Sequence, residues 1–302
     1  MWAHIGPTGA GRGARGSVLG VERHTITRYV EALREGGSLP GLVEADDDGL
    51  YVVKLRGAGQ GVRALVAEIV VGLLAAEIGI RTPELALLEL ADAIGWGEPD
   101  PEIQSLLLAS TGINVGVDFL PGSLPYVAHG AAVVPADEAA GIIWLDFLTT
   151  NVDRTARNPN LLWWHGALWA IDHGAALYRH HASEQIAGDA DRPFPQIAEH
   201  VLLAQLGDSA EERRAVLLAA HERLAPLVTR AALDRIVSEI PADWRDEHDY
   251  ASYLVERVRV VGEQLAGTML SLESAPVVPP APGEGAGIPT YRRPPRPGER
   301  PR

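Results

Sequence analysis

The chain has 302 residues, of which 46% are hydrophobic and 22% are charged, and it carries a formal net charge of −14. This length and composition are typical of a globular protein with a sizeable core in one large domain or two lobes. The chain has no cysteine, which excludes disulfides, cysteine-ligated zinc and cysteine nucleophiles. Its acidic charge argues against a surface that binds nucleic acid.

The two ends of the chain have the composition of tails. Residues 1–17 are rich in Gly and Arg and lack the apolar stretch of a signal peptide. Residues 275–302 hold nine of the 22 prolines and five arginines. Such segments bury too little apolar surface to offset the cost of ordering, so we expect both tails to be disordered. No stretch is apolar enough to span a membrane, and we expect a cytoplasmic protein.

From residue 18 to residue 120 the pattern is mainly that of strands. The acidic turn at residues 46–49 predicts a hairpin over residues 42–54. The first predicted helix, residues 63–78, is followed by a glycine and then by a proline, which end it. The predicted strands cover residues 24–34, 42–45, 50–55, 84–90 and 113–120, and the predicted helices cover residues 63–78 and 101–110.

From residue 121 to residue 274 helices dominate. The predicted helices cover residues 136–150, 197–206, 210–221, 225–240 and 250–272. The exception is a short hairpin over residues 161–171, with its turn at His165-Gly166. A sheet-rich first part and a helical second part predict two lobes, residues 18–120 and 121–274, and ligands favour the cleft between such lobes.

Lys54 stands out because it is the only lysine beside 25 arginines. Lysine offers a compact charge on a flexible stem, whereas arginine offers a planar fork. At the end of a predicted strand, before a loop and a helix, a retained lysine suits the phosphates of a nucleotide. The alternative is a single lysine that escaped codon bias.

A loop and a hairpin in the second part carry acidic and amide side chains at a fixed spacing. Asn158 follows Asp153 by five residues, and Asp172 comes fourteen residues later, at the end of the hairpin. Protein kinases place a catalytic Asp, a metal-binding Asn and a metal-binding Asp in this order, and Mg²⁺ prefers such oxygen ligands. Each residue alone fits an ordinary turn, but the three in order favour phosphotransfer. Arg154 and Arg157 in this loop suit either a phosphate or a pairing with Asp146 or Asp153.

Glu68 is the only charged residue between Ala64 and Ala76 in a predicted helix. It flanks the apolar stripe of that helix, and a carboxylate that faces protein needs a partner. We expect it to pair with Lys54, as in the Lys–Glu pair of kinases. The alternatives are exposure to solvent, a pairing with arginine, or Glu77 in its place.

The chain resembles the HipA-like kinase family in three segments: Val53-Lys54, Asn151-x-Asp153-x-x-x-x-Asn158-Pro-Asn and Ile171-Asp172-His173-Gly174. The resemblance covers about residues 20–265. It implies an α+β, bilobal protein-kinase-like fold with a sheet-rich N-lobe and a mainly helical C-lobe. It also implies that ATP binds with Mg²⁺ between the lobes, that Lys54 binds the phosphates and that Asp153 is the catalytic base. Asn158 and Asp172 would hold the metal.

Two further parts of a nucleotide site follow from this resemblance. The backbone N–H groups of Gly36, Gly37 and Ser38 lie before the second strand, where they would cover the phosphates. A simple turn, or the glycine-rich loop at residues 57–61, is the alternative. The last predicted strand would lead to the hinge, and the adenine would face the backbone of Val117, Asp118 and Phe119.

Three functions agree with these observations. The first is an ATP- and Mg²⁺-dependent kinase that transfers the γ-phosphate to a hydroxyl, Ser or Thr of a protein. The second is a non-catalytic ATP-binding module, which the incomplete glycine loop favours. The third is a kinase of a small molecule or a lipid headgroup. The sequence has no signal that identifies the acceptor.

Overall fold

The computed structural model describes residues 20–33, 39–59, 61–128, 133–182, 185–267 and 272. The predicted tails, 1–17 and 275–302, and the predicted phosphate loop with Gly36, Gly37 and Ser38 lie outside these residues. Within the described residues, no helix has the length and apolar character needed to cross a membrane.

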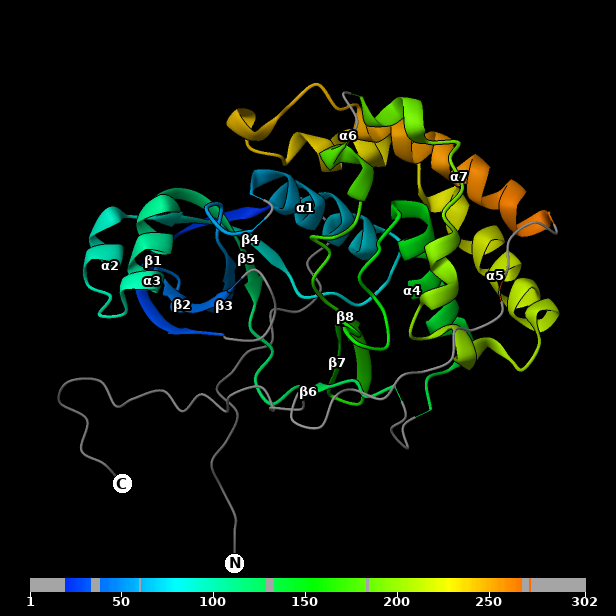
Figure 1. The fold of residues 1–302 in the computed structure, drawn as a ribbon, viewed down its shortest axis with the longest axis horizontal. Coiled ribbons are helices and arrows are strands. Elements are labelled where there is room, and N and C mark those ends of the chain that lie inside the picture. The colour runs from blue at the N-terminus through cyan, green and yellow to red at the C-terminus, as the bar shows by residue number, and fades with distance from the viewer. Residues whose placement is uncertain are drawn as a thin grey trace, which may run out of the picture.

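The first part of the chain is built around a five-stranded sheet (Figure 1). Its strands are β1 (Glu22–Ala32), β2 (Gly41–Ala45), β3 (Leu50–Lys54), β4 (Leu85–Leu90) and β5 (Gly112–Asp118). They pair in the order β1-β2-β3-β5-β4, and β1 also pairs in parallel with β4, so the sheet closes into a barrel. Closure leaves fewer unpaired strand edges than an open sheet has.

Alternating apolar side chains fill the inside of this sheet. Ile26, Val43, Val53 and Leu88 are buried there, as the period of two along a strand requires. Two short helices in the β4–β5 connection, α2 (Asp92–Trp96) and α3 (Pro101–Ala109), cover the same core. We did not predict α2, since five residues are too few to show a helical period.

The second part is mainly helical, as predicted. Its α-helices are α4 (Ala136–Thr149), α5 (Ala210–Leu224), α6 (Arg230–Ser238) and α7 (Tyr250–Ala266). A three-stranded sheet of β6 (Leu124–Pro125), β7 (Leu161–Trp164) and β8 (Ala167–Ala170) lies beside them, and β7 and β8 form the predicted hairpin. The chain is therefore a mixed α+β protein with a sheet-rich first part and a helical second part.

Helix α1 (Val62–Glu77) joins the two parts. It is buried on nearly all sides between Leu65 and Ala75, and its apolar side chains belong to the same core as those of α4 and α7. In Figure 1 it lies between the barrel and the helices of the second part. A helix that is apolar all round is buried in a protein interior, so α1 is held from both sides.

Three predicted helices differ from the structure. Residues 197–206 form two 3₁₀ turns, η3 (Pro195–Glu199) and η4 (Leu203–Leu206), because His200 between them has an extended backbone. The helix predicted to begin at residue 225 begins at Arg230 instead, after a proline and a Thr229 cap. The last helix ends at Ala266, where Gly267 has an extended backbone.

Candidate active site

Lys54 lies at the end of β3 and contacts two carboxylates. Its Nζ lies 2.6 Å from Glu68 Oε2 and 2.5 Å from Asp172 Oδ1. The Lys54 side chain is 13% exposed and that of Glu68 only 1%. The expected Lys54–Glu68 pair is therefore present, while Glu77 pairs with Arg235 instead.

The charges of this cluster are coupled. Burial alone would disfavour the Lys54 ammonium, but Asp172 and Glu68 outweigh it and hold the pKa of Lys54 above its usual value. Burial raises the pKa of the Glu68 carboxyl, and the adjacent ammonium opposes that shift. The pKa of Asp172 is lowered, first by the charge of Lys54. Lys54 and Asp172 therefore form an ion pair at neutral pH.

Glu68 also binds the segment that follows the β7–β8 hairpin. Its Oε2 accepts a hydrogen bond of 2.8 Å from the backbone N–H of His173. Asp172 itself has a positive φ of 55°, a left-handed conformation that Asp and Asn tolerate better than most residues. The buried carboxylate on α1 thus fixes the backbone beside Asp172.

The loop after α4 holds Asp153 between two amide side chains. Asp153 Oδ2 accepts hydrogen bonds from Asn158 Nδ2 at 2.7 Å and Asn160 Nδ2 at 3.3 Å. The backbone N–H of Asp153 donates to Asn151 Oδ1 at 3.1 Å. Burial raises the pKa of the Asp153 carboxyl, the two amide donors oppose that shift, and the charge of Asp172 adds to it. Asp153, Asn158 and Asp172 thus lie in one electrostatic neighbourhood.

Asn158 and Asp172 fit the ligand preferences of Mg²⁺. Asn158 donates its amide nitrogen to Asp153, so its amide oxygen is the atom it offers to a cation. Lys54 contacts one carboxylate oxygen of Asp172, and the other remains a candidate ligand. Both are hard oxygen donors of the kind that Mg²⁺ prefers.

A second polar network lies beneath the Asp153 loop, and the sequence did not identify His200 as part of it. Arg154 Nε contacts Asp146 Oδ2 of α4 at 2.5 Å, and both side chains are 0% exposed. His200 Nε2 lies 2.9 Å from the same oxygen. Arg154 was predicted either to bind a phosphate or to pair with a carboxylate. In the structure it pairs with Asp146.

The adenine contact predicted for the backbone of Val117, Asp118 and Phe119, at the end of β5, stays a prediction. The N–H of Asp118 donates to the Glu84 oxygen at 2.9 Å, and the N–H of Phe119 donates to the Leu50 oxygen at 3.0 Å. Val117 pairs with Val52 inside the sheet. The N–H groups of Asp118 and Phe119 thus already donate within the protein, so the backbone carbonyl oxygens are the groups left to face a base.

The family of the chain follows from its sequence. The family model described as HipA-like kinase matches residues 26–266. The chain belongs to the HipA-like kinase family. Membership of a kinase family supports a phosphotransferase activity, and the matched region contains Lys54, Glu68, Asp153, Asn158 and Asp172.

Two solved kinase structures are similar to part of the chain. The HipA-like kinase is similar to the proinflammatory kinase CtkA of Helicobacter pylori, with 13% identity, 75% of this chain and 94% of that chain covered, and a TM-score of 0.48. It is also similar to a Golgi casein kinase with Mn and ADP bound, with 14% identity, 82% and 72% coverage, and a TM-score of 0.44. A search of curated proteins found no match. At these TM-scores the structural similarities add nothing to the family match.

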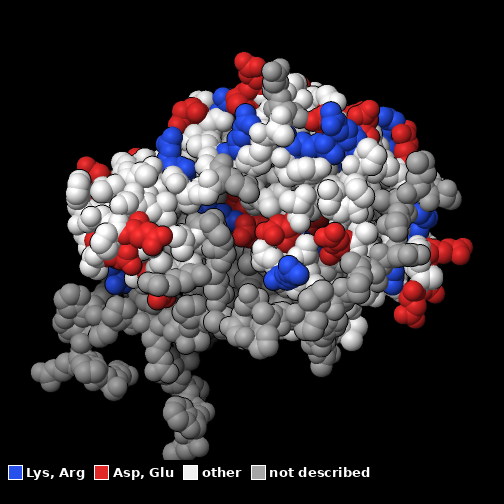
Figure 2. Space-filling view, in the orientation of Figure 1, with Lys and Arg blue, Asp and Glu red and all other residues white. Residues whose placement is uncertain are grey.

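Acidic side chains mark the surface where the two parts of the HipA-like kinase meet. Figure 2 shows them gathered near the middle of one face, between the barrel and the helical part. The Asp172 side chain of the Lys54 cluster is itself 43% exposed. Negative charge at this place suits a divalent cation better than a free nucleotide.

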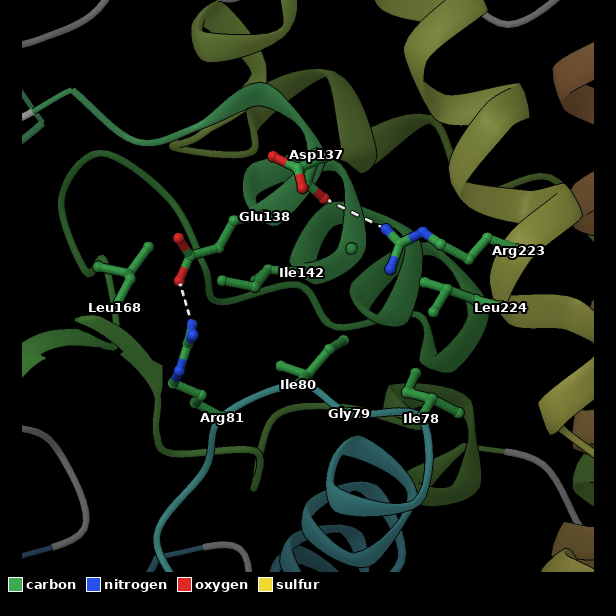
Figure 3. A pocket seen from close by; sticks show the side chains of 11 residues that line it. Ile78, Gly79, Ile80, Arg81, Asp137, Glu138, Ile142, Leu168, Arg223 and Leu224 are labelled. Atoms are coloured by element: carbon green, nitrogen blue, oxygen red, sulfur yellow. Dashed lines mark hydrogen bonds and ion pairs between the residues drawn. The ribbon is translucent and has the colours of Figure 1, made fainter.

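A small cavity of about 60 Å³ lies away from these residues. It is lined by the residues after α1, by the start of α4 and by the end of α5, and Figure 3 shows Arg81 paired with Glu138 on its wall. None of Lys54, Glu68, Asp153 and Asp172 lines it. The cavity is therefore separate from the Lys54 cluster.

Proposed function

We propose that this HipA-like kinase is an ATP- and Mg²⁺-dependent enzyme that transfers the γ-phosphate to a Ser or Thr hydroxyl of a protein. One observation carries the proposal: Lys54 contacts Glu68 and Asp172 together, at 2.6 and 2.5 Å. A lysine held by a helix carboxylate beside a metal-binding Asp is the arrangement that active kinases use on nucleotide phosphates. We also propose a two-lobed arrangement, residues 18–120 and 121–274, with the nucleotide between them.

Each charged side chain of the cluster would have its own role in binding the nucleotide or the metal. Glu68 holds the Lys54 ammonium, which would contact the phosphates. Asp172 and Asn158 would hold Mg²⁺, which neutralises charge on the transferred phosphoryl group when bound. The glycine segment at residues 36–38, which lies between β1 and β2 in the sequence, would cover the phosphates.

Asp153 would accept or orient the proton of the acceptor hydroxyl. Asn158 and Asn160 both donate to its Oδ2, so its other oxygen is the one that would face the acceptor. Burial, with the charge of Asp172, raises the pKa of this carboxyl, which makes it a better proton acceptor than an ordinary aspartate.

The experiment is transfer of labelled phosphate from ATP with Mg²⁺, to the protein itself and to a cell lysate, followed by mass-spectrometric mapping. We expect wild type to label protein and Asp153→Ala to label none. If label appears only in small molecules or lipids, the acceptor is one of these and not a protein. Thermal stabilisation by ATP with no transfer in any fraction would overturn the proposal and favour a non-catalytic ATP-binding module.

A further inference from the structure

Arg154 is the buried charge nearest in sequence to the proposed base, and its partner is equally buried. The Arg154–Asp146 pair is fully inside the protein, with Nε 2.5 Å from Oδ2. Burial alone would raise the pKa of Asp146, but Arg154 and then His200 outweigh it, so that pKa lies well below its usual range. A buried pair of this kind contributes little net stability compared with apolar residues of the same volume, so stability alone is a weak account of it.

The remaining Arg154 nitrogens bind both halves of the proposed metal site. Nη1 donates to the backbone oxygen of Asn160, at the end of the Asp153 loop, and to the Ile171 oxygen at 3.2 Å, just before Asp172. Nη2 lies 3.3 Å from His173 Nδ1, just after Asp172. One guanidinium therefore spans the loop of the base and the segment of the metal ligand.

The same network reaches α1 and the connection to β4. His173 Nε2 lies 3.4 Å from Thr82 Oγ1, and the His173 N–H donates to Glu68. Glu68 in turn contacts Lys54. A continuous set of buried polar contacts thus connects Lys54 with Arg154 through the residue that follows Asp172.

His200 holds the network from a segment far along the chain. Its Nδ1 accepts a hydrogen bond from the Leu202 N–H at 3.1 Å, so Nε2 carries the proton that it donates to Asp146. The N–H of Val201 donates to the Arg154 oxygen at 3.1 Å, and Thr155 pairs with His200 as an isolated bridge. The extended backbone that interrupts the predicted helix at His200 is therefore part of the Asp153 loop support.

We propose that Arg154 is a positioning residue that sets the Asp153 loop against the Asp172 segment, and that Asp146 and His200 hold its guanidinium in place. This inference rests on the proposed phosphotransfer for its kinetic readout. Its metal-binding readout does not need turnover. Outer contacts that orient metal ligands change metal affinity or activity by about 10- to 100-fold when removed.

Arg154→Lys tests the role, since lysine keeps the charge beside Asp146 but cannot span Asn160, Ile171 and His173 at once. We expect kcat to fall about 10- to 100-fold, the Mg²⁺ concentration for half-maximal rate to rise by a similar factor, and the KM for ATP to change less than about 3-fold. His200→Gln retains a donor near Asp146 and loses the acceptor for Leu202, so it should show a smaller effect in the same direction.

The matched control is Arg213→Lys. Arg213 is also buried and also donates to backbone oxygens, those of Gly207 and Leu272, but it does so away from the Asp153 loop. Both variants remove buried arginine hydrogen bonds, so a purely structural role predicts similar losses of thermal stability and no change in Mg²⁺ dependence in either. Equal Mg²⁺ dependence in wild type, Arg154→Lys and Arg213→Lys would overturn the proposal.

A second measurement separates this proposal from the proposed function. Binding of Mn²⁺ and ADP is titrated by calorimetry in wild type and in the two arginine variants. If wild type binds both but transfers no phosphate, the proposed function fails, and the Mn²⁺ affinity of Arg154→Lys alone decides the positioning role. If wild type binds no Mn²⁺ with ADP, both proposals fail. If Arg154→Lys does not fold, His200→Gln takes its place in both measurements.

Discussion

Lys54 faces more negative charge than it can neutralise. Glu68 and Asp172 both lie within 2.6 Å of its Nζ, and the charge of Asp172 acts on Asp153 as well. One ammonium among three carboxylates leaves an excess of negative charge in a partly buried place, which favours binding of a divalent cation. The charge of Lys54 and the charges of the proposed metal ligands therefore depend on one another.

Replacing Lys54 by arginine tests the need for a point charge. We expect Lys54→Arg to lower phosphotransfer about 100-fold or more, because the planar fork does not fit between two carboxylates and a phosphate. The free energy of unfolding should change by only about 1 kcal/mol, since the charge remains. Initial rates and thermal unfolding measure the two effects. Arg56→Lys, two residues along, is the control, and unchanged transfer in Lys54→Arg would remove the special role of lysine.

The pH profile tests the role of Asp153. A base works in its ionised form, and its pKa is raised, so the ionised fraction falls at a higher pH than for an ordinary aspartate of about 3.9. We expect kcat to decline as the pH falls toward that raised pKa, while the fold measured by circular dichroism is still intact. A rate independent of pH down to about 4 would contradict Asp153 as the base.

At the scale of elements, α1 positions the site from within a core. Its apolar side chains pack against both the sheet and the helical part, and its one buried carboxylate contacts β3 and the His173 backbone. The position of the helix is thus fixed by apolar packing and by the contacts of Glu68 with Lys54 and the His173 backbone. A shift of α1 would move Lys54 and the Asp172 segment together, because both bind the same oxygen.

Glu68→Gln isolates this connection. Glutamine can still accept the His173 hydrogen bond but lacks the charge that holds Lys54, so we expect kcat/KM to fall about 10- to 100-fold. Glu77→Gln on the same helix removes a partly exposed pair with Arg235, and it should leave the rate within about 2-fold. Steady-state kinetics of the two variants give the comparison, and equal losses would show a general effect of disturbing α1.

The sequence predicts the ion-pair partner of Glu68 better than that of Asp146, although each is the only charged residue in an apolar stretch of helix. Asp146 is the only charged residue between Ala139 and Val152, which is the same signal that identified Glu68. Glu68 has one possible lysine partner, whereas Arg154 and Arg157 could each bind a phosphate, Asp146 or Asp153, so the sequence alone does not decide for the Arg154–Asp146 pair. The sequence did not predict the role of His200 for another reason. A helix was predicted at His200, but its backbone is extended and pairs with Thr155 of the Asp153 loop.

At the scale of the molecule, the periodicity of the sequence predicts most helices and strands, but it does not predict that the five-stranded sheet closes into a barrel. The parallel pairing of β1 with β4 joins residues some sixty positions apart, and no local pattern encodes such a contact. The two cores divide the protein differently from the predicted lobes, since α1 belongs with the helical part. Several histidines are buried in the larger part, including His173 and His180.

Buried histidines should make the stability of the whole protein depend on pH. Burial lowers the pKa of His173 and of His180 to about 3, and Arg154 adds to the shift at His173 while His181 and His248 add to it at His180. The unfolded chain takes up protons below about 6.5 while the folded protein does not, so stability is full above that pH and falls as the pH drops. We expect a loss of about 1–2 kcal/mol for each histidine between pH 7 and pH 5.

Chemical denaturation of wild type and His180→Gln at both pH values measures this effect. The variant lacks one of the buried imidazoles, so its free energy of unfolding should fall less between pH 7 and pH 5. His165→Gln, in an exposed turn, is the control and should match wild type. An identical pH dependence in all three proteins would contradict the assignment to His180.

Lys54 is also the only side-chain amine of the protein. An acylating reagent therefore has one internal target, and the two carboxylates that keep this amine protonated also keep it unreactive. Release of either carboxylate would expose a nucleophile, and a bound nucleotide would shield it. Acylation of the peptide that contains Lys54, measured by mass spectrometry after digestion, is then a footprint of the Lys54 site, read without any engineered label.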